Sequence, residues 1–306
     1  MIRRWLRHLR LAGQLNLPWR TSQLKQMVQV QLARDSAPRP NALAGVVFSF
    51  DRALQLFALL ESYFLQAQDP APLSVLFRAS SKAHQGAYAE VRRLCKDWPV
   101  TFVEEYAFRS DLLDLLAALE ATRVFFLVDD ILFTQEFDFT EALKQDPKEA
   151  VFSLRHGAQL DFHYMLGLPM QRPPLQEEGG FIRWRWRQGE YDWGYPLSVD
   201  GHIFDTREFL AQCRMIPFKA PNSLEHGLQI FWPLFADRAG VAYATSRQVN
   251  VPYNKVQQEF ANKAGALDPE KMLAYWNQGQ KLDVAAWKGY ANRGVHEDLP
   301  LKLTER

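Results

Sequence analysis

This sequence has few cysteines, almost no net charge and no long apolar run. Two cysteines occur among 306 residues, Cys95 and Cys213, and their spacing argues against a disulfide framework or a zinc site. The 36 basic residues balance 35 acidic ones, and a net charge of +1 argues against a dedicated nucleic-acid-binding protein. No apolar run is long enough for a membrane span and no secretory signal is evident, so we expect a cytoplasmic protein.

The first 35 residues differ from the rest. Lys and Arg side chains are opposed by a single acid, Asp35, and alternate with apolar residues such as Trp5 and Trp19. A basic amphipathic helix of this kind can lie on the inner face of an anionic membrane. It can equally pack on the body of the protein with a solvated basic face, and the sequence leaves both interpretations open. We place the end of this N-terminal segment at residue 40, after a proline-containing linker.

Beyond residue 44, strand-like and helix-like segments alternate. Asp51, Ser81 and Ser110-Asp111 are suited to cap the three expected helices. This order predicts an α/β fold, in which helices flank both faces of a mostly parallel sheet. We expect strands at 45–50, 73–77, 100–103 and 124–128, and helices at 51–68, 81–96 and 110–119.

The second half of the chain has a different pattern. Residues 181–187 alternate strictly, which predicts a smaller β-ribbon, and further strands are expected near 150–154, 197–204 and 241–251. The last 50 residues are expected to form peripheral helices. Four aromatic residues of this half are candidates for an acceptor-sugar platform: Trp184, Trp186, Trp193 and Tyr195. For Trp184 and Trp186 we favour a position in the core instead.

Two adjacent carboxylates, Asp129 and Asp130, follow a run of apolar residues. Such a run indicates a buried strand of a parallel sheet. Buried acids need a partner, and ligands of open α/β sheets bind at the carboxyl ends of strands. The two carboxylates are therefore a candidate binding site for Mg²⁺ or Mn²⁺ together with a phosphorylated ligand. A solvated strand end or a helix cap is the alternative.

The order of these segments resembles a GT-A-fold glycosyltransferase, most closely the family 2-like enzymes that use nucleotide-diphosphate sugars. The resemblance covers roughly residues 44–235. Two motifs depart from the family pattern: Val-Asp-Asp at 128–130 replaces Asp-x-Asp, and Glu225-His226 replaces Glu-Asp. The segments that carry the resemblance are 47–56, 77–81, 129–130, 199–204 and 224–228.

The resemblance implies a role for each matching residue. Glu225 is the expected general base and His226 the runner-up, as a base or an extra metal ligand. Asp130 is expected to hold the metal, and Asp129 the ribose or a metal-bound water. Late in the chain, Asn254 and Gln257 are expected to close the site. The residues expected to contact the nucleotide sugar are Phe48, Ser49, Asp51, Arg52, Arg78, Asp111, Asp129, Asp200, Gly201 and His202.

Several of these residues also have a structural interpretation. Arg52 and Arg78 are suited to surface ion pairs, and Asp111 to a helix cap. His202 alone is more typical of a structural histidine. Glu225 would also favour the dipole of a first helical turn.

The resemblance implies a catalytic domain at 41–240, with a nucleotide half at 41–135 and a donor-sugar and acceptor half at 136–240. Residues 241–306 are expected to pack on it. The implied function is a metal-dependent, inverting glycosyltransferase that acts in surface polysaccharide or glycoconjugate synthesis on a glycan or lipid-linked acceptor. A sugar nucleotidyltransferase is an alternative, although no glycine-rich loop follows the first strand. A non-catalytic carbohydrate-binding protein is another.

Overall fold

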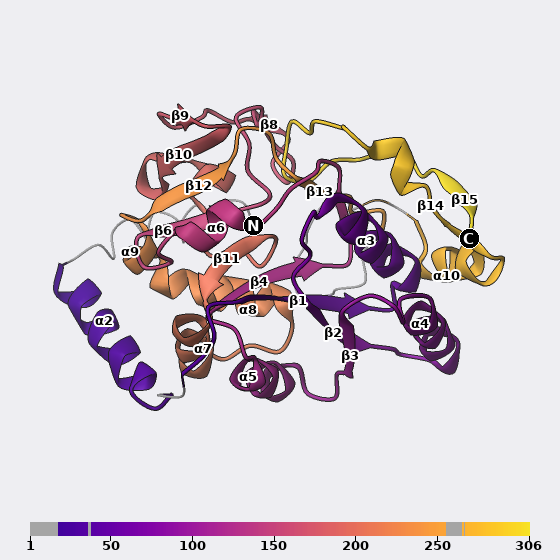
Figure 1. The fold of residues 1–306 in the computed structure, drawn as a ribbon, viewed down its shortest axis with the longest axis horizontal. Helices are drawn as coiled ribbons and strands as arrows, with labels where there is room; N and C mark the ends of the chain where they lie inside the picture. The colour runs from indigo at the N-terminus through magenta and orange to yellow at the C-terminus, as the bar shows by residue number, and fades with distance from the viewer. Residues whose placement is uncertain (1–17, 36–37, 255–264, 266) are drawn as a thin grey trace.

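A mixed sheet organises the molecule, and a computed structural model describes it over residues 18–35, 38–254, 265 and 267–306. In this part of the chain nine strands follow the order β3-β2-β1-β4-β11-β6-β12-β10-β9, with helices on both faces (Figure 1). The predicted α/β fold is confirmed. The strands are β1 (Leu43–Phe50), β2 (Leu73–Arg78), β3 (Val100–Glu104), β4 (Arg123–Val128), β6 (Ala150–Ser153), β9 (Gln176–Glu178), β10 (Phe181–Arg185), β11 (His202–Asp205) and β12 (Ala239–Tyr243).

Short strand pairs and helices complete the described fold. The pairs are β5 (Ile131–Phe133) with β13 (Gln248–Asn250), β7 (Phe162–His163) with β8 (Leu168–Pro169), and β14 (Gln280–Leu282) with β15 (Leu303–Glu305). The helices are α2 (Pro18–Leu32), α3 (Ala53–Gln66), α4 (Lys82–Leu94), α5 (Phe108–Ala118), α6 (Thr140–Lys144), α7 (Thr206–Met215), α8 (Pro221–Leu228), α9 (Trp232–Phe235) and α10 (Pro269–Asn277).

Strand direction brings distant parts of the sequence to one edge of the sheet. Strands β1 to β4 pair in parallel, and β6 pairs in parallel with β12. Strand β11 is antiparallel to both β4 and β6, so β4 and β6 point the same way. The carboxyl ends of β1, β4 and β6 therefore lie together with the beginning of β11. We call this place the carboxyl edge.

The central strands are buried on both faces, as their continuous apolar sequences predict. Val47 and Leu127 pack in one core with α3, α4 and α10. Their neighbours Val46 and Phe126 point to the other face and pack with α5, α7 and α8. Burial of both faces fixes the register of β1 and β4, because a slip of one residue would exchange the two sets of side chains.

Of the three expected helix caps, one is confirmed and two are wrong. Ser110 and Asp111 lie inside α5, which begins at Phe108 after the N-cap Ala107. Ser81 caps α4, and its hydroxyl accepts a hydrogen bond from the backbone N–H of His84. Asp51 does not cap α3, whose N-cap is Arg52 without a side-chain bond. Asp51 has a φ of 54°, in the left-handed region that Asp tolerates better than most residues. Its carboxylate instead accepts a hydrogen bond of 2.8 Å from the backbone N–H of Ser80, beyond the end of β2.

The expected β-ribbon is part of the main sheet, because β10 pairs with β12 and β9. The core interpretation of Trp184 and Trp186 is confirmed, since both are buried. Trp193 is buried with them, and its ring centroid lies 5.0 Å from that of His156. The indole N–H of Trp184 donates to the carbonyl of Trp193. These indoles hold the loop before β11 against the sheet.

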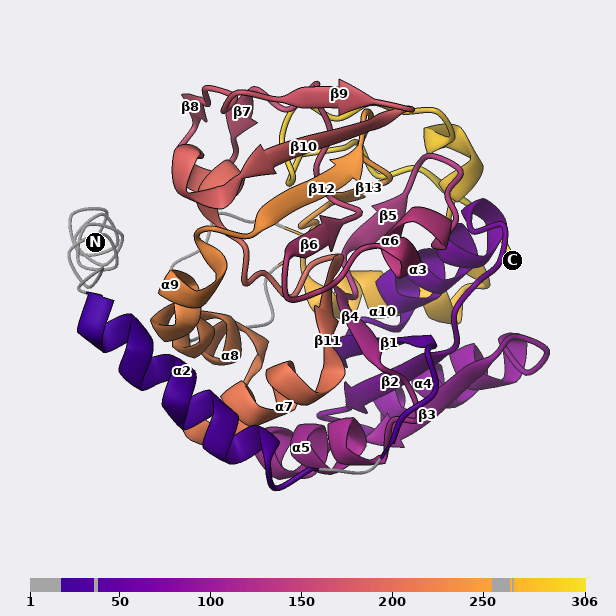
Figure 2. The same ribbon diagram turned by 60° about the vertical axis from the view of Figure 1, so that its left-hand side comes forward.

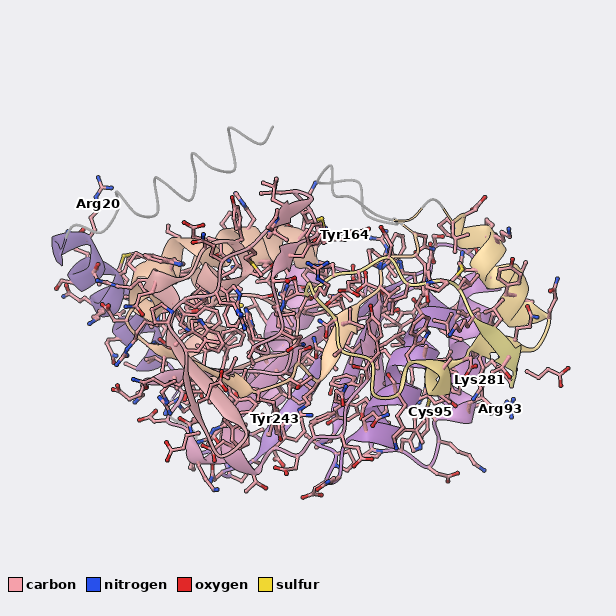
Figure 3. The ribbon with its side chains drawn as sticks, turned by 90° about the horizontal axis from the view of Figure 1, so that it is seen from above. Arg20, Arg93, Cys95, Tyr164, Tyr243 and Lys281 are labelled. Carbon is pink, nitrogen blue, oxygen red and sulfur yellow. The ribbon has the colours of Figure 1, made fainter. Side chains whose placement is uncertain are left out.

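The two ends of the described chain pack on opposite parts of the body. Helix α2 lies along α7 and α9, with Val28 buried and Arg207 donating to the carbonyl of Leu32 (Figure 2). The rest of the expected membrane segment, residues 1–17, lies outside the described residues. Across the part that the structure describes, none of the helices combines the length and the apolar character that crossing a membrane requires. At the other end, Lys281 forms an ion pair with Glu61 of α3 (Figure 3).

Gly240 of β12 lies opposite Trp184 of β10, and a Cβ atom there would lie 2.2 Å from the indole Cε2. We predict that Gly240→Ala lowers the free energy of unfolding by about 1–3 kcal/mol, because a rigid buried indole must move. Gly86 in α4 is the control, because a methyl group added there would meet no atom within 4 Å. Gly86→Ala should raise stability by up to about 1 kcal/mol. Urea unfolding measures both, and equal stability of the two variants would contradict this packing.

Candidate functional site

Charged side chains from four separate segments meet at the carboxyl edge. Strand β1 is followed by Arg52, β4 by Asp129 and Asp130, and β6 by Arg155. Asp200 immediately precedes the turn into β11. Because the carboxyl ends of β1, β4 and β6 coincide with the beginning of β11, residues up to about 150 positions apart in the sequence form one site.

Asp129 is the buried anchor of the nucleotide half. It is 4% exposed, and its Oδ2 accepts hydrogen bonds from the Ser49 hydroxyl at 2.9 Å and the Phe50 N–H at 3.2 Å. Its Oδ1 accepts one from Arg52 Nη1 at 2.9 Å. Both carboxylate oxygens are therefore engaged by the protein, and the ion pair fixes Arg52 at the edge.

Asp130 is much less fully paired. Its Oδ1 accepts a hydrogen bond of 3.1 Å from Asn250 Nδ2, and its Oδ2 lies 3.6 Å from Arg52 Nη1. Burial raises the pKa of Asp130 to about 6, and Arg52 opposes the rise while Asp129 and Asp200 add to it. A carboxylate that is largely buried and only partly paired is favoured by another cation.

Arg155 holds the second group of acids. It is 4% exposed, and its guanidinium lies 3.5 Å from the carboxylates of both Asp192 and Asp200. It also donates to the Ser198 hydroxyl. Burial raises the pKa of Asp200 to about 7, with Arg155 opposing the rise and the neighbouring acids Glu225 and Asp192 adding to it.

Glu225 comes to this group from α8. Its Oε1 accepts a hydrogen bond of 3.1 Å from the backbone N–H of Val199, which precedes Asp200. Burial raises the pKa of Glu225, and Arg155 and the hydrogen bonds from Ser198 and Val199 oppose the rise. His226 is exposed on the next position of the helix. Of the two predicted bases, Glu225 is the one that the structure brings to Asp200.

Negative charge therefore exceeds positive charge in this buried region. The acids outnumber the two guanidinium groups, Arg52 and Arg155, that contact them among the described residues. Burial raises the pKa values of three of these carboxylates, and the repulsion between neighbouring acids adds to the rise. We call these five residues the acid cluster: Asp129, Asp130, Asp192, Asp200 and Glu225.

The acid cluster fits a hard divalent cation that is also held by a ligand. Asp130 supplies carboxylate oxygens of the type that Mg²⁺ and Mn²⁺ prefer, and its Oδ1 accepts one hydrogen bond from Asn250. Within the described residues, no group of three or more His, Cys, Asp or Glu side chains is arranged to hold a metal alone. Such a cation typically uses one or two carboxylates and completes its shell with phosphate oxygens and water.

The other predicted contacts divide between the edge and the core. Ser49 lies at the site through Asp129, and Gly201 through Asp200. The side chain of Phe48 packs in the core against Phe108 and Phe126. His202 is fully buried among aromatic rings, and its Nδ1 lies 2.9 Å from the carbonyl of Pro196.

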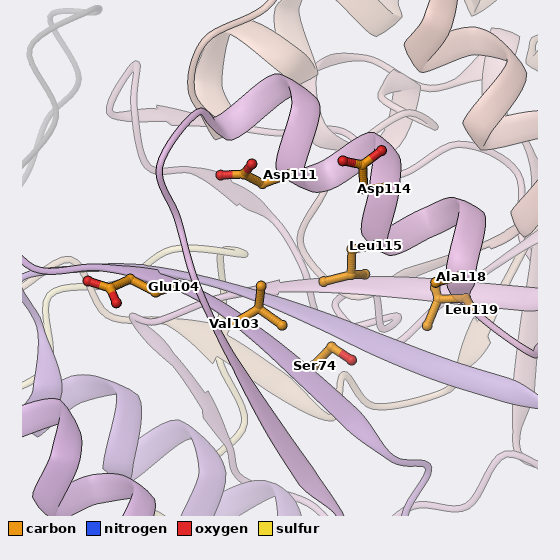
Figure 4. Close-up of a pocket in the computed structure, with 8 residues that line it drawn as sticks. All are labelled: Ser74, Val103, Glu104, Asp111, Asp114, Leu115, Ala118 and Leu119. Carbon is orange, nitrogen blue, oxygen red and sulfur yellow. The ribbon is translucent and has the colours of Figure 1, made fainter.

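The remaining predicted contacts lie away from the acid cluster. Arg78 is well exposed, with its Nη1 3.9 Å from Glu105. Asp111 accepts hydrogen bonds of 2.7 Å from the N–H groups of Tyr106 and Ala107, so it holds the start of α5. It also lines a cavity of about 480 Å³ between α5 and strands β2 and β3, which includes no acid-cluster residue (Figure 4).

A second cavity, of about 260 Å³, lies near the acid cluster. Its lining includes Tyr164 (Figure 3) and His296. The N–H of Glu297 donates to the carbonyl of Asn250, whose side chain contacts Asp130. Asn250 thus connects the wall of this cavity with the acid cluster.

Sequence reasoning did not find Arg155, Asp192 or Asn250. Arg155 follows a predicted strand in the same way as Asp129 does, and that position was the available signal. Asp192 and Asn250 carry no local signal. Asn254, expected late in the site, lies beside Arg52, and its carbonyl accepts a hydrogen bond from that guanidinium. Gln257 lies outside the described residues.

Comparisons with known proteins identify similar structures only. No family model and no curated protein matches the sequence. Mannosyltransferase PcManGT from Pyrobaculum calidifontis, in complex with GDP-Man and Mn²⁺, is 17% identical, with a TM-score of 0.30 over 42% of this chain and 43% of that chain. Residues 1–349 of S. aureus TarS are 14% identical, with a TM-score of 0.43 over 66% and 58%.

The bifunctional glycosyltransferase WbbM, in its apo structure, is 14% identical with a TM-score of 0.38 over 85% of this chain and 48% of that one. The chain spans about half of the length of these three proteins. At such identities and scores we base the function on the residues of this chain.

Without a bound cation, Asp200 should make thermal stability fall as the pH rises from about 4 to about 7. The folded protein retains a proton on Asp200 up to a pKa of about 7, whereas the unfolded chain releases it near 3.8. Asp200→Asn removes this dependence. We expect the variant to melt a few degrees above the wild type at pH 8 in EDTA, and to gain nothing at pH 4. An equal difference at both pH values would contradict the raised pKa.

Proposed function

We propose that the protein is a glycosyltransferase that moves a sugar from a nucleotide-diphosphate donor to an acceptor hydroxyl with the help of Mn²⁺ or Mg²⁺. The observation that carries this proposal is the acid cluster, a buried surplus of carboxylates at the carboxyl edge of an α/β sheet. Ligands of open α/β sheets bind at this edge. The resemblance of the motif order to GT-A enzymes supports the same assignment.

We assign the donor to the nucleotide half of the edge. Asp130 would hold the cation, with Asp129 as its predicted neighbour. A divalent cation bound there supplies positive charge to the diphosphate leaving group. Arg52, which Asp129 holds in place, adds a positive charge, and its N–H groups can donate hydrogen bonds to phosphate oxygens. Ser49 and Asp51 remain predicted contacts of the nucleotide, and Asp200 and Gly201 of the donor sugar.

We assign the general base to Glu225. Its carboxylate is oriented by the Val199 N–H, and a pKa raised towards neutrality suits a group that accepts a proton from a hydroxyl. A base opposite the leaving group implies inversion at the sugar carbon. His226, one position further along the helix and exposed, is the alternative base.

We assign the acceptor to the side of the second cavity, next to Asp130. His296 in its lining is partly exposed and offers a ring of the kind that stacks on sugars. Tyr164 is 4% exposed and stacks on His296, with the ring centroids 6.1 Å apart. A glycan or lipid-linked acceptor of surface polysaccharide or glycoconjugate synthesis fits such a wall. Contact of residues 1–35 with the inner face of the membrane would favour the lipid-linked acceptor.

Melting temperatures in the presence of nucleotides test the proposal. We expect one family among UDP-, GDP-, dTDP- and CMP-linked sugars to raise the melting temperature only when Mn²⁺ is present, because a ligand of the native state stabilises it. Metal-free stabilisation by free sugars alone would instead favour a carbohydrate-binding protein.

Two substitutions separate binding from chemistry. Asp130→Asn should remove the Mn²⁺-dependent part of donor binding, because the cation loses its carboxylate. Glu225→Gln should keep donor binding and lower the turnover number by about 100- to 10,000-fold, as expected for loss of a general base. Isothermal titration with the donor and a product assay measure the two effects. Near-normal turnover of Glu225→Gln, with inactive His226→Ala, would move the base to His226.

A further inference from the structure

Three buried carboxamides near the acid cluster have polar atoms that find no partner. Gln248 is fully buried, and Asn250 and Asn254 are each 1% exposed. Across the described residues, Gln248 Oε1 and Nε2, Asn250 Oδ1 and Asn254 Nδ2 have no hydrogen-bond partner. A buried amide without partners is unfavourable for folding. Three such amides within residues 248–254 point to a ligand that pairs with them.

The first two of these amides face the acid cluster from β13. Val249 between them packs in the core, so alternation along the strand turns Gln248 and Asn250 to the opposite face. Asn250 Nδ2 donates to Asp130 Oδ1 at 3.1 Å, which directs its amide to that carboxylate.

Gln248 lies against the turn that carries Asp200. Gly201 has a φ of +79°, and a Cβ atom there would lie 2.6 Å from Gln248 Oε1. Only a residue without a side chain lets the amide approach this closely. Gln248 and Asn250 therefore line the carboxyl edge beside both Asp200 and Asp130.

The unpaired atoms indicate which chemical class binds. The free atom of Asn250 is an acceptor, since its Nδ2 is committed to Asp130, and Gln248 offers both an acceptor and a donor. Phosphate oxygens only accept hydrogen bonds, so they would leave the acceptor oxygens of both amides unpaired. A sugar hydroxyl donates one hydrogen bond and accepts others, so it matches both amides.

We propose that Gln248 and Asn250 form a subsite that binds hydroxyl groups of the donor sugar. This inference rests on the proposed glycosyltransferase function and adds residues of β13 to its donor site. The nucleotide and the diphosphate lie outside the subsite. Loss of the amide should therefore weaken binding of the sugar conjugate and leave the nucleoside diphosphate unaffected.

Gln248→Met tests the subsite, because methionine keeps the length of the side chain and removes both polar atoms. Isothermal titration in Mn²⁺ compares UDP with UDP-glucose and GDP with GDP-mannose. We expect the dissociation constant of the nucleoside diphosphate to stay the same and that of the bound conjugate to rise about tenfold, as the loss of two hydrogen bonds implies.

Gln212→Met is the matched control. Across the described residues, Gln212 is also fully buried with both amide atoms unpaired, but it lies in α7, which follows the end of β11 that is distant from Asp200. We expect it to leave the ratio of the two dissociation constants unchanged.

Deoxy analogues of the conjugate that binds test the subsite on the wild type, even where Gln248→Met does not fold. One missing hydroxyl should cost about tenfold in affinity, and equal binding of all analogues overturns the subsite. So does an unchanged ratio in a folded Gln248→Met that still binds the nucleotide. Absence of Mn²⁺-dependent nucleotide binding by the wild type overturns the proposed function, and the subsite with it.

Discussion

The surplus of buried negative charge at the carboxyl edge is the constraint on which the account of this protein depends. Carboxylates at this depth are unfavourable without cations, and the chain provides Arg52 for one pair of acids and Arg155 for another. Burial raises the pKa values of Asp130 and Asp200, and the neighbouring acids add to the rise. A cation-bearing ligand would offset this unfavourable negative charge, so the same feature favours binding.

The rest of the fold holds this strained region in place. Cores on both faces fix the register of β1 and β4, and therefore the positions of Arg52 and of the acids after β4. The buried indoles around His156 hold the loop that carries Asp192 and leads to Asp200. A site of like charges needs such a frame, because each carboxylate would otherwise move out to water.

The sequence predicted what is local and missed what the tertiary structure brings in. The strand ending at Asp129-Asp130 and the α/β order could be inferred from apolar runs and turns. Arg155 follows an apolar run as Asp129 does, but the antiparallel insertion of β11 decides which acids it meets. Asn250 could not be inferred, because the pairing of β13 with β5 decides its position. Alternation explains Phe48, which sits in a matching motif but points to the core while Ser49 reaches Asp129.

Titration with Mn²⁺ in the presence of the nucleoside diphosphate tests the central claim most directly, because the cation is expected to complete its shell with phosphate oxygens. Isothermal titration at pH 6.5, in two buffers of different ionisation heat, counts the protons released when the cation binds. The account predicts Mn²⁺ binding with proton release, and an affinity that rises from pH 5 to pH 8, because the cation competes with protons on Asp130 and Asp200. Binding without proton release, or no binding at any pH, would contradict it.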